Sequence, residues 1–532
     1  MDLNNEKEIN QKFSLAVDHY KNNNFQKAID LFKEIIFLNS KNINAYLNLG
    51  AIFFKIKNFK ESIKYYENAL KINPNHIKSY NNIGVAFREI GNFQKALENF
   101  KNIIKLDPNN LDALNNLGLI LIDLKDTKKS KQYFQKVLKI EPNHVDALNN
   151  IGIVFKNEKQ YENSINSYKK IIKINPKYIN AYYNLGCIYK ELKSYNDAIK
   201  YLNDTIKIFK EHEGALLALG IIYEEQGRYN KALEYYNSII KINSTNKTAV
   251  NNAGVVLLNM GRIKEAKSQF KKALKIDPSF VGAHWNLCGT VSSIKEASAI
   301  LDQILEIDPK QTETKILGDT FKNLDNNIKN FKMIKPDHHY SRSVKWYYSL
   351  PNIPQIFFNR WSLFDEMIKI SDKSRPFYEF GVWNGVSFKY LIKFFKQGYG
   401  FDTFEGIPDA WHNEPKGSYS SQGIIPKIEG GNFIVGKFEN ELPKFFSKKR
   451  PKASLINFDA DLYSSTICAL ENCKEIIDKT TILIFDEFFM NKNWEEDEFK
   501  AINEFCGKYN FKYKVIAVSF FSKQVAVRLI KK

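Results

Sequence analysis

The segment Asn48–Pro74, "NLGAIFFKIKNFKESIKYYENALKINP", contains the pattern that decides the fold of roughly the first 300 residues. A glycine in it recurs every 34 residues, followed 12 positions later by a small residue and 16 positions later by a large one. The glycines are Gly50, Gly84, Gly118, Gly152, Gly186, Gly220 and Gly254. This spacing predicts pairs of closely packed helices, in which the large residue fills the space beside the glycine and a proline ends the second helix.

These units resemble the tetratricopeptide repeat. The resemblance implies an α-solenoid, a superhelix built from helix pairs. A less regular unit begins near Asn10 with Ala16 in the glycine position, and a shortened one begins near Gly282 with Cys288 there. We therefore expect about nine repeats over residues 10–311, then a capping helix and linker over residues 312–340.

An asparagine stands two residues before most of the glycine positions. The row comprises Asn48, Asn82, Asn116, Asn150, Asn184, Asn252 and Asn286, and Ala218 interrupts it. An amide can pair with both polar groups of a peptide backbone, so the row favours a groove that binds an extended protein or peptide partner. In this respect the repeats resemble those of the O-linked N-acetylglucosamine transferase. The alternative is that asparagine is simply frequent at this position.

The periodicity changes after the linker. Seven short apolar runs follow in the order "RPFYEFG", "QGYGFDTF", "NFIVGKF", "ASLINFDAD", "TTILIFDEFF", "YKVIAVSF" and "QVAVRLI". The first five are separated by helix-like or loop segments, which predicts a parallel sheet with crossovers. The last two are adjacent and predict an antiparallel hairpin. Residues 341–532 should therefore form one α/β domain of the Rossmann-like type.

The stretch "YEFGVWNGVSFKYL" (Tyr378–Leu391) places a glycine turn between the first predicted strand and a helix, where open α/β sheets bind ligands. Glu379 before the turn suits a cationic group, and Asp402 at the end of the second strand suits ribose hydroxyls. An amino group, a sulfonium and a ribose together describe S-adenosylmethionine. The predicted cofactor residues are Glu379, Gly381, Gly385, Ser387, Asp402 and Thr403.

Three longer motifs, "GFDTFEGIPDAWHNEPKGSYS", "INFDADLYSSTICALENC" and "ILIFDEFFMNKNWEEDEFKAINEF", resemble the macrocin-O-methyltransferase-like class I methyltransferases. The resemblance covers roughly residues 340–532. It implies methyl transfer from S-adenosylmethionine to a hydroxyl, often on a sugar and often with a divalent metal. It also implies that Asp459, Asp486 and Glu487 bind the metal, with Glu487 in place of the more usual aspartate. Three carboxylates at adjacent strand ends suit Mg²⁺.

Asp459 is also a candidate catalytic residue because a metal beside it would activate a substrate hydroxyl. Asp461 either lies behind the metal ligands as a supporting acid or caps the helix that begins near Ser464 or Ser465, and we favour the cap. The loop from Glu405 to Gly431 carries His412, which is either a general base or a merely exposed loop histidine. Trp411 and Tyr419 in the same loop suit stacking on a sugar or packing on the surface.

Composition sets further bounds. The 532 residues carry a formal net charge of +19, but acids interleave with the lysines and no basic patch with aromatics stands out, so we expect no nucleic-acid partner. No apolar run is long enough to span a bilayer, and the N-terminus lacks a secretory signal. Five cysteines without a C-x-x-C motif fit a cytoplasmic protein.

Two functions are compatible with these observations. The first is an S-adenosylmethionine-dependent O-methyltransferase that acts on a glycan or another small hydroxylated acceptor, including a protein-linked one, while the array recruits the substrate or a partner. The second is a protein-interaction scaffold with a degenerate methyltransferase domain. The retained acids Glu379, Asp402 and Asp459 favour the first.

Overall fold

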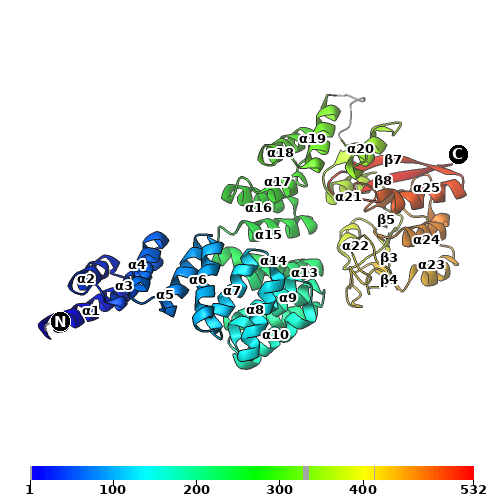
Figure 1. The fold of residues 1–532 in the computed structure, drawn as a ribbon. Helices are drawn as coiled ribbons and strands as arrows, with labels where there is room; N and C mark the ends of the chain where they lie inside the picture. Colours follow the sequence, from blue (N-terminus) through cyan, green and yellow to red (C-terminus); the bar gives the residue numbers. More distant parts are fainter. Residues whose placement is uncertain (1–2, 327–334, 413, 532) are drawn as a thin grey trace. The chain divides into compact units, whose positions relative to one another are not determined.

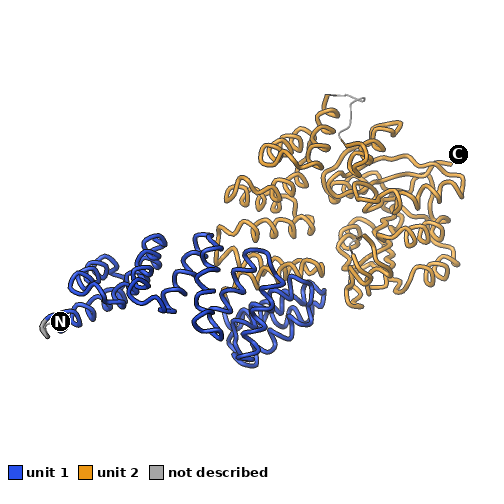
Figure 2. The backbone as a smooth tube through the Cα atoms, in the orientation of Figure 1, with its two compact units in different colours: residues 1–210 blue, residues 211–532 orange. Residues whose placement is uncertain are grey.

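The computed structural model describes residues 3–326, 335–412 and 414–531. The chain divides into two compact units, residues 1–210 and residues 211–532, which Figure 2 distinguishes by colour. The first unit holds helices only, and the second holds further helices followed by a sheet domain (Figure 1).

The first unit consists of six helix pairs within its described residues. They are α1 (Leu3–Lys21) and α2 (Phe25–Leu38), α3 (Ile43–Lys55) and α4 (Phe59–Ile72), α5 (Ile77–Glu89) and α6 (Phe93–Leu106), α7 (Leu111–Asp123) and α8 (Thr127–Ile140), α9 (Val145–Asn157) and α10 (Tyr161–Ile174), α11 (Ile179–Glu191) and α12 (Tyr195–Ile208). Each helix packs against its partner and each pair against the next pair in the unit.

The second unit begins with three more pairs and one unpaired helix. These are α13 (Glu213–Glu225) and α14 (Tyr229–Ile242), α15 (Lys247–Asn259) and α16 (Ile263–Ile276), α17 (Val281–Cys288) and α18 (Ile294–Ile307), and then α19 (Thr312–Asp325). Helix α19 lies where the capping helix was expected. Residues 327–334 of the expected linker lie outside the described residues.

The predicted pairing of each glycine with a large residue is confirmed by the packing. A Cβ atom on Gly50 would lie 2.6 Å from the Tyr66 ring, and one on Gly118 would lie 2.5 Å from the Phe134 ring. The small residue also contributes, because the Ser62 hydroxyl donates to the Gly50 carbonyl over 2.8 Å. Close helix approach therefore explains why glycine, a small residue and a large residue recur together.

The turn between the two helices of a pair contains one residue in the left-handed region. Its φ lies between 55° and 77° in eight pairs. The eight residues are Asn23, Lys57, Gly91, Lys125, Lys159, Lys193, Gly227 and Gly261. The position tolerates lysine and asparagine, so glycine there is not required by the turn itself.

The sheet has eight strands in the order β1-β7-β8-β6-β5-β2-β3-β4. They are β1 (Gln355–Phe357), β2 (Phe377–Phe380), β3 (Gly398–Asp402), β4 (Gly431–Val435), β5 (Leu455–Phe458), β6 (Ile482–Phe485), β7 (Phe511–Ser519) and β8 (Val525–Lys531). All seven predicted strands are present, and the antiparallel pairing of β7 with β8 is confirmed. The prediction missed β1, which pairs in parallel with β7.

Helices cover both faces of this sheet (Figure 1). They are α20 (His339–Tyr348), α21 (Arg360–Lys369), α22 (Val386–Leu391), α23 (Phe438–Phe446), α24 (Tyr463–Cys473) and α25 (Glu498–Lys508), with short 3-10 turns at Lys474–Ile476 and Trp494–Glu496. Successive strand residues alternate between two buried clusters. Phe377 packs with α21 and α22, whereas Tyr378 packs with α24 and α25.

The strand order changes direction between β2 and β5, because β3 and β4 continue on one side and β6 on the other. Such a switch point opens a crevice beyond the carboxyl ends of the two strands. Gly381 follows β2 and Asp459 follows β5. A Cβ atom on Gly381 would lie 1.8 Å from the Asp459 carbonyl oxygen, so this crossing of the two chains requires glycine.

None of the helices in the described ranges combines the length and apolar character that a membrane crossing would need.

Candidate functional site

A cavity of about 640 Å³ lies at the carboxyl edge of the sheet, within the second unit. The strand-end loops and α21 line one side of it. Helical repeats line the other side, with Tyr229, Leu258, Asn259, Trp285, Asn286 and Gly289. The sequence placed the site in the C-terminal domain alone and did not predict that the repeats contribute a wall.

The glycine turn forms the floor near β2. Gly381 and Gly385 have φ of 86° and 69°, and Trp383 between them has φ of 49°. The carboxylate of Asp402 holds this turn, because one oxygen accepts from the backbone amides of Val382 and Trp383, each over 2.7 Å. Its other oxygen accepts from the amide of Phe404 over 2.7 Å. A carboxylate offers about four acceptor positions, so Asp402 retains room for one ligand hydroxyl.

Glu379 lies behind the turn and is 1% exposed. The Asn457 amide donates to its Oε1 over 2.8 Å, while Oε2 has no hydrogen-bond partner in the described part of the chain. Burial raises the pKa of Glu379 to about 8, although Asn457 and Arg360 act in the opposite direction. The side chain is therefore mostly protonated at neutral pH, and it holds a polar atom that a ligand or water would satisfy.

The predicted cofactor residues do not all reach the cavity. Gly381, Ser387, Asp402 and Thr403 line it. Glu379 and Gly385 support the turn from behind. These positions surround the turn as the sequence indicated, but Asp402 is also a structural part of it.

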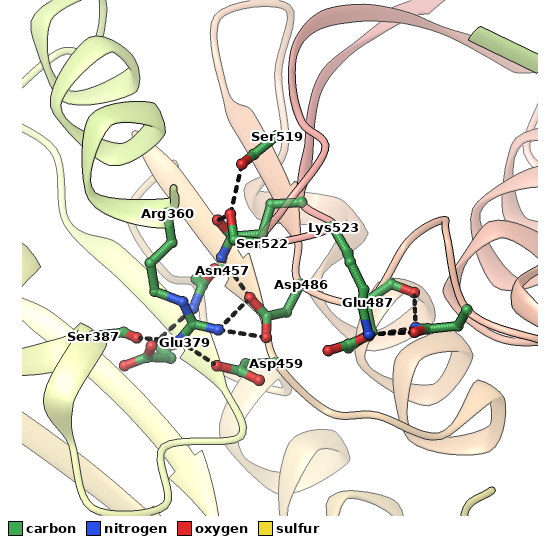
Figure 3. A network of polar contacts seen from close by, with 12 residues as sticks. Arg360, Glu379, Ser387, Asn457, Asp459, Asp486, Glu487, Ser519, Ser522 and Lys523 are labelled. Atoms are coloured by element: carbon green, nitrogen blue, oxygen red, sulfur yellow. Dashed lines mark hydrogen bonds and ion pairs between the residues drawn. The ribbon is translucent and has the colours of Figure 1, made fainter. Parts of the chain in front are cut away.

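Arg360, the first residue of α21, lies between two of the predicted metal ligands (Figure 3). Its guanidinium donates to the two oxygens of Asp486 over 2.8 Å and 2.7 Å. It lies 3.8 Å from the carboxylate of Asp459. Gln524 also donates to Asp486. Arg360 belongs to no motif that would mark it in the sequence, so the sequence did not predict its place in the site.

Glu487 points away from this pair (Figure 3). Its carboxylate accepts from Lys523 over 3.1 Å and from the amide of Asn491. In the described ranges, ligand atoms of three suitable residues come within 4.8 Å of one another at Glu313, His338 and His339, not here. In this arrangement Asp486 pairs with Arg360 and Glu487 pairs with Lys523, so the three predicted metal ligands do not converge on one point.

Burial and the nearby Asp486 raise the pKa of Asp459 well above its usual range, with Arg360 opposing. The same causes raise the pKa of Asp461. The prediction that Asp461 caps the next helix is wrong. Helix α24 begins at Tyr463 after Leu462 without a side-chain cap, and Asp461 lines the cavity instead.

The loop that follows β3 contributes aromatic rings. Trp411 and Tyr419 line the cavity, and the Tyr419 ring meets the Trp383 ring edge to face with centroids 5.9 Å apart. His412 does not line it. Its Nε2 lies 2.9 Å from a carboxylate oxygen of Asp497, so the candidate base is engaged in a hydrogen bond outside the cavity.

Some side chains of the asparagine row form hydrogen bonds to neighbouring repeats of the array. Asn116 donates to Asn81 of the preceding repeat over 3.2 Å, and Asn150 donates to Asn115 over 3.1 Å. Asn286 donates to Asn251 in the same way and also lines the cavity. Six of the seven side chains are half-buried and Asn150 is buried, and three of the seven amides link neighbouring repeats.

Family models match only the repeats. Two models described as "Tetratricopeptide repeat" match residues 43–76, 77–110 and 215–246, and residues 111–144, 179–212 and 248–280. A third, described as "TPR repeat", matches residues 155–193. No curated protein matches the chain.

Solved structures of repeat proteins are similar over part of the chain. A tetratricopeptide repeat protein from Parabacteroides merdae is 18% identical, covering 47% of this chain and 99% of its own, with a TM-score of 0.40. MamA is 23% identical, with 32% and 94% covered and a TM-score of 0.29. YrrB, described as having an unusual peptide-binding site, is 21% identical, with 35% and 95% covered and a TM-score of 0.29.

Together, the family-model matches and the helix pairs identify residues 43–280 as an array of tetratricopeptide repeats, a class of repeat that binds peptide or protein partners.

Proposed function

We propose that this protein is a tetratricopeptide-repeat scaffold whose C-terminal domain transfers a methyl group from S-adenosylmethionine to a hydroxyl, on a sugar or another small hydroxylated acceptor. The observation that carries the proposal is the cavity at the switch point of the sheet, where the glycine turn, Asp402 and Asp459 meet. Ligands of open α/β sheets bind at this place. The largely parallel sheet with the antiparallel strand β8 also agrees with the class I methyltransferases that the sequence resembles.

The residues present fit the cofactor. The free acceptor position of Asp402 suits a ribose hydroxyl, and Ser387 and Thr403 add hydroxyls to the same wall. Gly381 and the amides of the turn lie beside it. The unsatisfied Oε2 of Glu379, behind the turn, could be satisfied by a water or by a hydrogen-bonding group of the ligand.

The charge of the lining supports the same ligand. Three cations face six carboxylates, namely Arg360, Lys437 and Lys523 against Asp402, Glu439, Asp459, Asp461, Asp486 and Glu487. An acidic wall attracts a sulfonium and repels the phosphates of a dinucleotide. This argues against an oxidoreductase with a nicotinamide cofactor.

When bound, S-adenosylmethionine supplies an electrophilic methyl group. The protein's own residues would prepare the acceptor. Asp459 lines the cavity beside the glycine turn and is placed to take the proton from the acceptor hydroxyl. Arg360 fixes Asp486 and balances the charge of Asp459, while Trp383, Trp411 and Tyr419 exclude water and hold the acceptor close.

A scaffold with an inactive C-terminal domain is the second candidate. The family-model matches all lie between residues 43 and 280, and they support the binding role of the array without reference to the sheet domain. The scaffold role is common to both candidates, so the cofactor decides between them.

Calorimetry with S-adenosylhomocysteine, the demethylated product, tests the proposal. We expect one molecule bound per chain and about a tenfold or greater loss of affinity in Asp402→Asn, because the amide nitrogen cannot accept hydrogen bonds. Asp478→Asn is the matched control, since Asp478 also accepts backbone amides, from Thr480 and Thr481, but does not line the cavity. Absence of binding to the wild type would favour the inactive scaffold.

A further inference from the structure

The C-terminal domain donates one side-chain hydrogen bond to each of three consecutive repeats. The three acceptors are backbone carbonyls at or next to the carboxyl ends of the first helices of these pairs. The bonds run from Asn384 to Gln226 over 2.7 Å, from Trp361 to Leu258 over 2.6 Å and from Asn359 to Gly289 over 3.0 Å. The C-terminal domain therefore contacts the array at the ends of α13, α15 and α17.

The residue at the left-handed turn position differs in the repeats that the C-terminal domain contacts. Lysine or asparagine occupies the left-handed position in five pairs, and glycine occupies it in three. A Cβ atom on Gly227 would lie 2.3 Å from the Asn384 amide nitrogen and 3.0 Å from the Trp383 ring. One on Gly261 would lie 3.4 Å from the Trp361 ring. Gly227 therefore makes room for side chains of the domain, whereas a Cβ atom on Gly261 would only touch the Trp361 ring at ordinary van der Waals distance.

The third glycine, Gly91, is a natural control for Gly227. Gly91 occupies the same turn position four repeats earlier, and a Cβ atom there would meet nothing within 4 Å. Its φ of 75° is close to the 65° of Gly227. The two sites share the backbone conformation and differ in what lies above them.

Trp383 and Asn384 belong to the glycine turn of the cavity. Trp383 holds a left-handed conformation that a bulky residue rarely adopts, so its surroundings must fix it. Asp402 binds its amide, the Tyr419 ring meets its ring, and Gly227 packs beneath the ring. One of these three contacts comes from the repeat array.

We infer that the seventh repeat positions the cofactor turn, with Gln226 and Gly227 as positioning residues for the cofactor site. The inference rests on the proposed function, because it assigns the turn to S-adenosylmethionine. A segment bound in the array that shifts this repeat would then change cofactor affinity, and the cofactor would change the affinity for that segment by the same factor.

The test compares Gly227→Ala with Gly91→Ala by calorimetry with S-adenosylhomocysteine. Both variants place alanine at a positive φ, but only the first crowds Asn384 and Trp383. We expect affinity to fall about tenfold in Gly227→Ala and to stay within about twofold of the wild type in Gly91→Ala. Asn384→Ala removes the bond to Gln226 without crowding and should also weaken binding. Circular dichroism checks that each variant is folded.

Equal affinities of the wild type and Gly227→Ala would overturn the inference, and so would an equal loss in both glycine variants. If the wild type binds no S-adenosylhomocysteine, the proposed function fails. Amide hydrogen exchange then still tests whether the seventh repeat positions the glycine turn. Faster exchange at the Val382 and Trp383 amides in Gly227→Ala than in Gly91→Ala would support it. Unchanged exchange would overturn it.

Discussion

Replacing Arg360 with methionine tests whether a guanidinium occupies the place expected for a metal ion. Methionine keeps much of the length of the side chain and removes the charge. The variant loses two hydrogen bonds to Asp486 and the 3.8 Å contact with Asp459. Both carboxylates then remain in a largely buried site without their cation.

The expected cost follows from the charges and their exposure. Unit charges about 4 Å apart attract by about 4 kcal/mol at an effective dielectric constant near 20, before desolvation is subtracted. Removing one partner of a buried pair costs about 3–5 kcal/mol. The Arg360 side chain is 30% exposed and that of Asp486 is 10% exposed, so we expect about 2–4 kcal/mol. For a domain of this size, that loss lowers the melting temperature by about 5–15 °C.

Arg375→Met is the matched control. Arg375 pairs with Asp478 over 2.7 Å and its side chain is also 30% exposed, but Asp478 is more exposed than Asp486. Exposed pairs contribute about 0–1 kcal/mol, so this variant should melt close to the wild type.

Scanning calorimetry with and without Mn²⁺ provides the measurement. Mn²⁺ should raise the melting temperature of Arg360→Met, because Asp459 and Asp486 are then available as oxygen ligands. It should leave the wild type unchanged, and chelator should not alter S-adenosylhomocysteine binding by the wild type. Stoichiometric Mn²⁺ binding by the wild type, or equal melting of the two arginine variants, would refute the reasoning.

Three further predictions concern Glu379, the asparagine row and His412. The pKa of Glu379 is about 8 in the folded protein against 4.5 normally, so its stability contribution is complete below pH 4.5 and is lost as pH rises through 8. Glu379→Gln should therefore melt with a weaker pH dependence between pH 5 and 9, as calorimetry across that range would detect. Asn150→Ala leaves Asn115 without its donor and should cost about 1 kcal/mol in urea unfolding, more than Asn48→Ala, whose amide bonds only within its own helix. His412→Gln should bind S-adenosylhomocysteine as the wild type does, because His412 pairs with Asp497 outside the cavity.

The sequence predicts well those features that repeat or that depend on neighbouring residues. Gly50 and its equivalents recur because two helices must approach closely, and Tyr66 fills the space that glycine leaves. The apolar strand runs and the hairpin were likewise local patterns. The glycine turn could be placed because a strand, two glycines and a helix start adjoin one another.

The missed features depend on contacts between distant residues. Strand β1 has three residues, none of them buried, and forms because β7 offers a free edge. Arg360 is one of 78 lysines and arginines, and only folding brings it to Asp486, 126 positions later in the chain. No local pattern distinguishes Asp402, whose carboxylate holds the turn, from an acid that only binds a ligand.

Two parts of the site, the helix that carries Arg360 and the glycine turn, each contact the array through one side-chain hydrogen bond. Asn359 begins the helix that carries Arg360, since its side chain accepts from the Ser362 amide over 2.9 Å. The same amide group donates to Gly289 of the ninth repeat. Asn384 in the glycine turn is bonded to the seventh repeat in the same manner. The helix that carries the cation and the glycine turn are thus each hydrogen-bonded to a repeat, so a C-terminal domain cut away from the last three repeats would lack one wall of the cavity and these contacts with it.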